Sequence, residues 1–276
     1  MICLHLMISV ILVLISNLFW GVLRQPYSWW LTPLLLISFF FALVILQMLL
    51  LLVPAQFVRF TGKPERGSRY FRFMVSITLP MLFSLARVRF CTRGLDKVPA
   101  NRRIMLVCNH QDNFDPAIIL ALLPAAQLAF IAKKEIYTDL KLVAKVIHKL
   151  HCLPIDREND REAAKTIIKA IQLVKEDKAS IGVFPEGYTS KSGELLPMRN
   201  GAFKIAMKAS VPIVVCVIDN VRAILPNLLR RRTDVHFRVL DVIEPEQFSG
   251  MSATDIGNVV LEKMQTGLTE IRSEKL

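Results

Sequence analysis

Two long apolar stretches open the chain, and no charged residue interrupts either one. They cover residues 2–23 and 31–53, which are runs of 22 and 23 residues. At about 1.5 Å of rise per residue, a helix of either length could cross the roughly 30 Å of hydrocarbon in a membrane. Only the seven residues 24–30 separate them, so we expect a helical hairpin whose two ends emerge on the same side.

The link between the stretches has the composition of a membrane interface, with Arg24, Tyr27, Trp29 and Trp30. A cleaved secretory signal peptide is the alternative, but it would need a basic start and a small-residue cleavage site, and the sequence has neither. We therefore predict a membrane-associated hairpin over residues 1–58. Hydropathy leaves open whether the helices cross the bilayer fully or form a shallow re-entrant pair.

A basic segment follows the hairpin. Its single acidic residue, Glu65, is opposed by eight basic residues: Arg59, Lys63, Arg66, Arg69, Arg72, Arg87, Arg89 and Arg93. Residues 70–85 are rich in Phe, Met, Leu and Ile and are broken by Pro80, which predicts a segment 59–93 lying on the headgroups, although it would also suit a first domain helix. By the positive-inside rule, we expect the rest of the chain on the cytoplasmic side of the cell membrane.

From residue 94 onward, short apolar runs alternate with helical patterns. Strand-like runs occur at 104–108, 128–132, 180–184, 213–218 and 235–240, and helical patterns at 116–123, 135–150, 160–175, 201–209 and 252–271. This alternation predicts an α/β domain over residues 94–276, with a central mixed sheet flanked by helices. The clearest helix starts after Asn159, three residues before Glu162 as in a capping box. We expect its apolar face to consist of Ala164, Ile167, Ile168, Ile171 and Val174.

Charge and cysteine content narrow the partners. The net charge is +12, and all but one unit belongs to residues 59–276, which predicts an anionic partner. The apolar hairpin favours an anionic membrane over nucleic acid, for which no aromatic-basic stacking motif is present. The five cysteines, Cys3, Cys91, Cys108, Cys152 and Cys216, form no C-x-x-C pair, so we expect no disulfide framework, no metal and a reducing compartment.

The string NHQDNFDP at residues 109–116 carries the first candidate chemistry, because it falls where a strand ends and a helix begins. Asp115 precedes Pro116 as an N-cap precedes a first-turn proline. Its carboxylate can turn back and hold one ring nitrogen of His110, which leaves the other nitrogen free to act as a general base. A plain helix cap and an ordinary loop histidine are the alternatives.

Two further strings contain candidate binding residues. FPEGYTS at residues 184–190 exposes Glu186 beside Gly187 at a strand end, where a carboxylate could contact substrate or a cation, or simply terminate the strand. LPIDR at residues 153–157 places Arg157 downstream of Lys133 and Lys134. These cations could bind a phosphate, or Arg157 could form an exposed ion pair with its neighbour Asp156.

The order of NHxxxxD, IDR, FPEG and VPIV at residues 211–214 resembles the four sequence blocks of the glycerophospholipid acyltransferases, over about residues 94–250. The resemblance implies that His110 is the catalytic base, oriented by Asp115. It further implies that Glu186 and Gly187 help to bind the acceptor, and that Arg157 with Lys133 or Lys134 binds its phosphate. No cofactor is implied, and a two-helix leader also fits the family.

Two positions depart from the family pattern. The third block usually continues Gly-Thr-Arg-Ser, but here Thr189 occupies the place of the arginine. In the fourth block Val215 stands where a second proline is usual. The first departure removes a cation expected near the acceptor phosphate, so the headgroup of the acceptor stays open.

The resulting functional prediction is a membrane-anchored acyltransferase that resembles the 1-acylglycerol-3-phosphate acyltransferases. It would transfer a fatty acyl group from acyl-CoA or acyl carrier protein to the free hydroxyl of lysophosphatidic acid and give phosphatidic acid, with His110 as general base. Transfer to another lysophospholipid acceptor, histidine-dependent lipid hydrolysis and non-enzymatic docking to anionic lipid are the alternatives. Cys108 could be proposed as a nucleophile, but its place on a strand favours inward packing.

Overall fold

The computed structural model describes residues 2–21, 28–60, 67–190, 192–228 and 230–274. The helices are α1 (Ile2–Trp20), α2 (Ser28–Gln56), α3 (Arg69–Leu85), α4 (Asp115–Leu122), α5 (Glu135–Asp139), α6 (Lys141–Lys149), α7 (Asp160–Lys175), α8 (Lys204–Ala209), α9 (Ile224–Asn227) and α10 (Ala253–Ser273). The strands are β1 (Val88–Arg93), β2 (Met105–Cys108), β3 (Leu128–Lys133), β4 (Leu153–Ile155), β5 (Ser180–Val183), β6 (Ile213–Asp219) and β7 (Thr233–Ile243).

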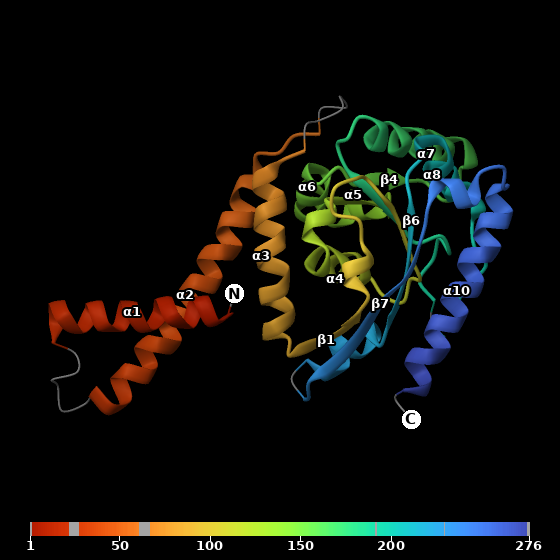
Figure 1. Ribbon diagram of the computed structural model, residues 1–276. Helices are drawn as coiled ribbons and strands as arrows, with labels where there is room; N and C mark the ends of the chain where they lie inside the picture. The colour runs from red at the N-terminus through yellow and green to blue at the C-terminus, as the bar shows by residue number, and fades with distance from the viewer. Residues whose placement is uncertain (1, 22–27, 61–66, 191, 229, 275–276) are drawn as a thin grey trace.

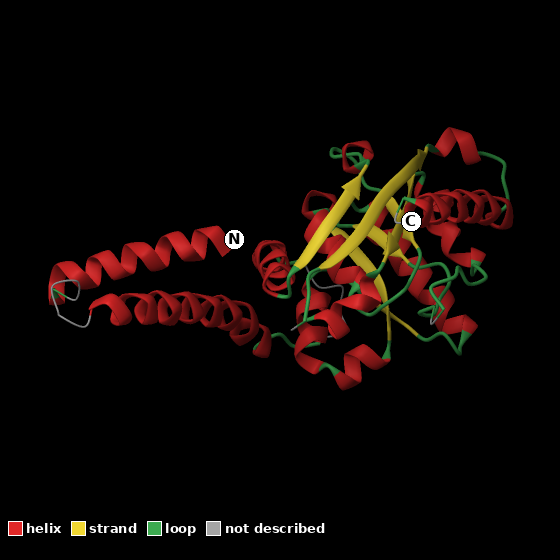
Figure 2. Cartoon of the chain, turned by 90° about the horizontal axis from the view of Figure 1, so that it is seen from below, coloured by secondary structure: helices red, strands yellow, loops and turns green. Residues whose placement is uncertain are grey.

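The strands form one sheet with the order β1-β7-β6-β2-β5-β3-β4. Every neighbouring pair is parallel except β6 and β7. Helices cover both faces (Figures 1 and 2), with α3, α4 and α6 on one side and α7, α8 and α10 on the other. The predicted mixed α/β sheet is therefore confirmed.

The central strand β2 is buried on both sides, which explains its uninterrupted apolar sequence. Leu106 and Cys108 pack against the α3 and α4 side, while Met105 and Val107 pack against the α8 and α10 side. This alternation follows from the two-residue period of a strand. All five cysteines are free, and Cys108 is fully buried as expected.

Helices α1 and α2 form the predicted N-terminal hairpin, which projects away from the sheet (Figure 2). Residues Ile2–Phe19 and Trp30–Gln56 are long and apolar enough to cross a membrane, which indicates membrane association. Arg24 and Tyr27 of the predicted interfacial belt lie outside the described residues, as does the side chain of Trp29, while Trp30 is exposed. Lys63, Glu65 and Arg66 of the basic segment also lie outside them.

The end of α2 belongs to the α/β domain. Ala55 is fully buried in the same core as Phe71 of α3. Gln47, a polar residue within the second apolar stretch, donates a hydrogen bond from Nε2 to Thr78 Oγ1 at 3.1 Å. Helix α3 thus lies between the hairpin and the sheet, as the first helix of the domain rather than only a surface segment.

Two strands are absent from the sequence prediction, and both lie at sheet edges. Strand β1 falls before the predicted domain boundary at residue 94, yet it pairs with β7 along its length. Its polar residues, including Arg89 and Arg93, are tolerated because an edge strand faces solvent. Strand β4 is three residues long and contains Pro154, which suits an edge but gives almost no sequence signal.

The single helix expected at residues 135–150 is two helices, because the backbone at Leu140 leaves the helical region (φ −116°, ψ 57°). The Tyr137 hydroxyl on α5 donates to Cys152 O at 2.7 Å, whereas Lys145 on α6 donates to Gln56 O at 2.7 Å. The two halves are therefore anchored to different elements.

Helix α7 starts where expected, since Asn159 accepts hydrogen bonds from the Arg161 and Glu162 amides. The predicted apolar face is displaced, however. The buried residues are Thr166, Ala170 and Val174, while Ala164 and Ile168 are exposed. Thr166 explains the shift, because its hydroxyl donates to Pro154 O at 2.9 Å and turns this polar residue toward the sheet.

Candidate active site

The two most specific sequence strings meet at one edge of the sheet. Strands β2 and β5 are parallel neighbours, with Val107 opposite Val183. Residues 109–114 follow β2, and residues 184–190 follow β5. The carboxyl ends of parallel strands form the usual ligand-binding edge of an open α/β sheet, so the loops that follow them are placed for chemistry.

His110 and Asp115 form the predicted pair, with His110 Nδ1 2.8 Å from Asp115 Oδ2. Asp115 is fully buried, and the same oxygen accepts the Gln111 and Asp112 amides at 2.6 and 2.9 Å. Oδ2 acts as an acceptor toward these amides, so we assign the Nδ1 proton to His110 as a third donor. No described residue is hydrogen-bonded to His110 Nε2, so this nitrogen is free to accept a proton.

The local backbone differs slightly from the predicted cap. Phe114 is the N-cap residue, and Asp115 is the first residue of α4, followed by Pro116. The Asp115 side chain therefore turns back over the preceding loop rather than capping its own helix. Burial raises the pKa of this carboxyl, and the hydrogen bond from His110 opposes that effect.

Aromatic rings orient the imidazole from the neighbouring strand. The His110 ring stacks on Phe184, with centroids 4.3 Å apart, and Phe184 stacks in turn on Phe130 at 5.5 Å. Gly182 makes room for this stack, because a Cβ atom there would lie 2.4 Å from Phe130 Cε1. The sequence indicated neither Phe184 nor Gly182 as part of the site, since both read as ordinary strand residues.

Two amide side chains hold the loop that carries His110. Asn109 bonds both ways to the backbone of Ile218 on β6, donating to its carbonyl oxygen at 2.9 Å and accepting from its amide at 2.8 Å. Gln111 Nε2 donates to Asp219 Oδ1 at 2.9 Å. Asn109 belongs to the recognised string, but its partner on β6 is far along the chain and left no local signal.

Glu186 differs from the sequence expectation. The sequence predicts contact with substrate, whereas in the structure the carboxylate is buried and accepts hydrogen bonds from backbone amides. Its Oε1 accepts the His110 amide at 2.8 Å, and its Oε2 accepts the Leu196 amide at 2.9 Å. Burial raises the pKa of this carboxyl as well. Glu186 therefore positions the backbone of His110.

Gly187 occupies the turn next to Glu186, at φ +75°, a conformation that favours glycine. A Cβ atom there would lie 3.1 Å from the Arg199 side chain. Gly187 therefore leaves room for Arg199, which the sequence analysis did not single out.

Arg157 and Arg199 lie together beside this turn. Their guanidinium carbons are 5.4 and 5.3 Å from the ring centroid of Tyr188, and Arg199 Nη1 donates to Arg157 O at 3.1 Å. Burial, and to a lesser extent the charge of Arg199, lowers the pKa of Arg157. Neither arginine forms an ion pair with a described carboxylate, so the alternative in which Arg157 pairs with its neighbour Asp156 is not found.

The two predicted lysines have different surroundings. Lys134 donates to Asp156 at 2.6 Å, so its charge is already balanced. Lys133 ends β3, opposite Ile155 of β4, and has no described carboxylate partner. The cation cluster of the site is therefore Arg157 and Arg199, while Lys133 lies on the neighbouring strand, opposite Ile155.

A histidine–carboxylate pair at the carboxyl edge of an α/β sheet is an arrangement that suits general-base chemistry. The family described as Acyltransferase matches residues 89–219, which include the His110 and Glu186 loops.

Relatives and a solved structure agree with this assignment. The chain is 31% identical over 156 residues to "Probable 1-acyl-sn-glycerol-3-phosphate acyltransferase" of Mycoplasma pneumoniae, a match that covers 55% of this chain and 57% of that one. It is 31% identical over 120 residues to "1-acyl-sn-glycerol-3-phosphate acyltransferase" of Bacillus subtilis, covering 43% and 57%. The chain thus spans little more than half the length of these relatives.

The fold resembles the crystal structure of "the 1-acyl-sn-glycerophosphate (LPA) acyltransferase, PlsC, from Thermotoga maritima", with a TM-score of 0.62 and 22% identity. The likeness covers 96% of this chain and 98% of the other. It therefore includes the N-terminal helices as well as the sheet.

Proposed function

We propose that this protein acylates the free hydroxyl of lysophosphatidic acid from a thioester donor and gives phosphatidic acid. One observation carries the proposal: His110 is held by Asp115 through Nδ1 and has no described partner on Nε2. The names of the relatives support the acceptor. The donor is an acyl group on coenzyme A or acyl carrier protein, and the reaction takes place at the cytoplasmic face of the cell membrane.

An alcohol needs a base because its pKa lies far above 7. His110 Nε2 takes the hydroxyl proton as the oxygen attacks the thioester carbonyl, a contribution of roughly 10²- to 10⁴-fold. Asp115 stabilises the imidazolium that forms. When the tetrahedral intermediate collapses, the C–S bond breaks and the thiolate takes the proton from His110. No covalent enzyme intermediate is required, and burial raises the pKa of the Cys108 thiol, which argues against that group as a nucleophile.

The acceptor phosphate binds at the cation cluster of Arg157 and Arg199, with Lys133 or Lys134 assisting. Two guanidinium groups held on the Tyr188 ring, neither of them ion-paired with a described carboxylate, repel one another, and a phosphate would relieve that repulsion. Arg199 would supply the cation that the family carries where this chain has Thr189. The unusual third block is therefore compatible with a phosphorylated acceptor.

The test of the chemistry uses two carboxylates in the same loop. Asp115→Asn removes the partner of His110 and is expected to lower kcat by at least about 100-fold. Asp112→Asn is the matched control, because its side-chain oxygen can still accept the Phe114 amide. His110→Ala should abolish transfer, and the double variant with Asp115→Asn should be no worse, since the two residues act as a unit. Near-normal turnover by folded His110→Ala would exclude the assigned role.

The test of the acceptor compares lysophosphatidic acid with an uncharged monoacylglycerol. Arg199→Gln and Arg157→Lys should each raise the KM for lysophosphatidic acid by about tenfold or more, because a charge-assisted contact contributes about 1.5–3 kcal/mol. Arg161→Gln, an exposed arginine on α7, is the control. Thr189→Arg should be tolerated. Unchanged KM values in both Arg157 and Arg199 variants would assign the acceptor to another class.

The same base could instead activate water and hydrolyse the donor or a lipid. Such an enzyme would release free fatty acid at the same rate without acceptor. Product analysis by mass spectrometry, with and without lysophosphatidic acid, separates the two reactions.

A further inference from the structure

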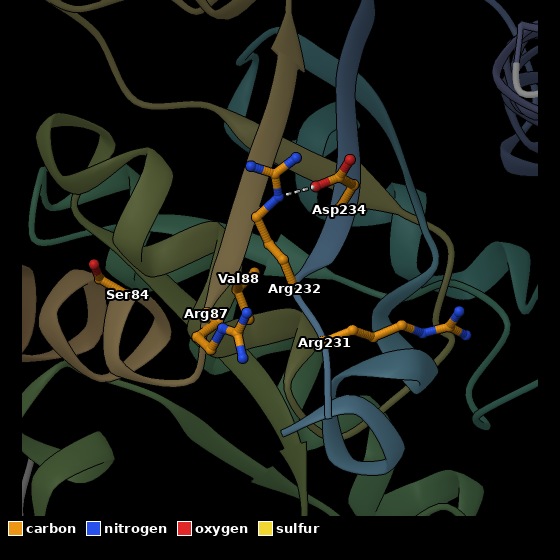
Figure 3. Close-up of a pocket in the computed structure, with 6 residues that line it drawn as sticks. All are labelled: Ser84, Arg87, Val88, Arg231, Arg232 and Asp234. Atoms are coloured by element: carbon orange, nitrogen blue, oxygen red, sulfur yellow. Dashed lines mark ion pairs between the residues drawn. The ribbon is translucent and has the colours of Figure 1, made fainter. Parts of the chain in front are cut away.

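A second basic surface lies outside the proposed active site, where β1 and β7 begin. It is an open groove of about 690 Å³ lined by Ser84, Arg87, Val88, Arg231, Arg232 and Asp234 (Figure 3). Arg232 points toward Asp234, whereas the side chains of Arg231 and Arg87 extend in different directions (Figure 3). The cations are spread over a surface rather than focused on one point, an arrangement that suits several anionic groups.

The positive charge of this groove is not balanced locally. Asp234 is shared between Arg89, whose Nε lies 2.9 Å from Oδ1, and Arg232 at 3.3 Å. In the described parts of the chain, no carboxylate pairs with Arg87 or Arg231. The segment 222–232 contains four arginines and no acidic residue.

Arg87 adopts an unfavourable backbone conformation for its residue type. It follows the C-cap of α3 at φ +57°, a position where glycine or asparagine is usual. The conformation is held by two backbone hydrogen bonds, from its amide to Ser84 O and from the Thr233 amide to its own oxygen. A strained backbone that retains a long cationic side chain suggests that the side chain has a use.

Exposed apolar side chains lie close in the sequence to the residues that line the groove. Leu225 is 61% exposed, Leu228 is 39% exposed and Leu85 is 38% exposed. Leu225 and Leu228 belong to the same short segment as Arg231 and Arg232, and Leu85 lies two residues before Arg87. Exposed leucines interspersed with arginines have the composition of a membrane interface.

The groove lies on the active-site edge of the sheet. Val88 and Thr233 begin β1 and β7, and the antiparallel pairing of β7 with β6 brings that end beside Asp219 at the end of β6. Asp219 bonds Gln111, the neighbour of His110. Three strand spacings of about 4.8 Å separate β1 from β2, so the groove and the His110 loop are roughly 14 Å apart along one edge.

The hairpin extends toward the same side. In Figure 1, α2 runs obliquely away from α3 to the lower left, and α3 descends to the start of β1 at the bottom of the domain. Helix α3 therefore contacts both the hairpin and the strand at whose start the groove lies.

We propose that this surface docks on the anionic face of the membrane, with phospholipid headgroups in the groove and Leu225 and Leu228 at the boundary of the acyl chains. The docking holds the active-site edge against the bilayer, where a lipid acceptor lies. It goes beyond the proposed acyl transfer and does not depend on it.

The experiment measures hydrogen exchange of residues 221–235 in the full chain, reconstituted in nanodiscs of phosphatidylcholine alone or with added phosphatidylglycerol. We expect slower exchange in the anionic discs only. Arg87→Gly with Arg231→Gln removes two cations and should lower the docked-to-undocked ratio about 30-fold. Arg87→Gly also relieves the backbone strain, so loss of folding is not expected.

The control is Lys169→Gln with Lys175→Gln, which removes the same charge from α7 near the opposite end of the sheet. It should retain the protection. Equal exchange in both disc types, or protection that survives in the Arg87 and Arg231 variant, would overturn the proposal. Equal protection by inorganic phosphate in neutral discs would assign the groove to a soluble anion, and protection by acyl carrier protein alone would assign it to an acidic protein. No substrate is present, so the result is independent of the proposed reaction.

Discussion

Glu186→Gln tests whether this buried carboxylate positions His110 or contacts substrate. In the native site, the two carboxylate oxygens accept one backbone amide each, from His110 and from Leu196. Glutamine has a single carbonyl oxygen, so its amide group must face one of these N–H donors. One buried donor is then left without an acceptor.

The magnitude follows from these contacts. Losing an acceptor for a buried amide costs about 1–3 kcal/mol, and each bond to a charged group contributes about 1.5–3 kcal/mol. Part of this loss is offset, because burial raises the pKa of Glu186 and so makes its charge unfavourable. We expect a net destabilisation of about 2 kcal/mol, which lowers Tm by about 5 °C for a domain of this size.

Activity and affinity should respond differently to this change. A displacement of the His110 backbone moves Nε2 relative to the acceptor hydroxyl, and a shift of about 1 Å can cost about 100-fold in rate. We therefore expect kcat to fall by about 10- to 100-fold while the KM for lysophosphatidic acid changes less than about twofold. Steady-state kinetics and a thermal melt of the same preparation give both numbers.

Glu194→Gln is the matched control, since Glu194 is exposed and pairs with Arg272 on α10. It should leave kcat and Tm nearly unchanged. A Glu186→Gln enzyme with an unchanged Tm and kcat but a raised KM would refute the positioning role and restore the substrate contact that the sequence predicts.

Two other substitutions test the packing behind His110 and the burial of His151. Gly182→Ala should displace the Phe130 and Phe184 rings that support His110, lower the stability by about 1–3 kcal/mol and reduce activity. Gly201→Ala is the control, because a Cβ atom there would have no other atom within 4 Å, and it should change neither stability nor activity. Burial and then the charge of Arg72 lower the pKa of His151 to about 4 in the folded protein. As the pH falls, the unfolded chain therefore binds a proton at His151 before the folded protein does. The free energy of unfolding should fall below about pH 6.5 and level off below about pH 4. Denaturant titrations of wild type and His151→Asn should show the wild type losing more stability, and parallel curves would contradict this.

The sequence predicted elements well where burial is uniform. Strands β2, β5 and β6 are covered on both faces, so they are apolar apart from Ser180 and Asp219 at strand ends and stand out from the flanking loops. The prediction failed where an element is half exposed or short, as at β1 and β4. It also failed in α7, where Thr166 replaces an apolar residue on the buried face and is tied to Pro154 by a hydrogen bond that no periodicity reveals.

In the candidate site, too, local contacts could be predicted from the sequence and contacts between distant segments could not. His110 and Asp115 are five residues apart, so local geometry at a strand-to-helix junction sufficed to predict their hydrogen bond. Arg199 reaches Arg157 across 42 residues, and its role depends on how the turn at Gly187 folds over it. The position of Glu186 depends on two amides from different loops. Contacts of this kind need the sheet order, which a single sequence does not provide.

The hairpin is coupled to the catalytic loop through one helix. On one side, α3 receives the end of α2 through the buried Ala55 and the hydrogen bond of Gln47 to Thr78. On the other side, Phe83 of α3 meets Phe114 edge to face, with ring centroids 6.5 Å apart. Phe114 immediately precedes Asp115, so α3 contacts both the end of α2 and the residue next to the histidine–carboxylate pair. The end of α2 is thus part of the packing around the site, and this accounts for the apolar residues of α3 on the side facing α2 and on the side facing the sheet.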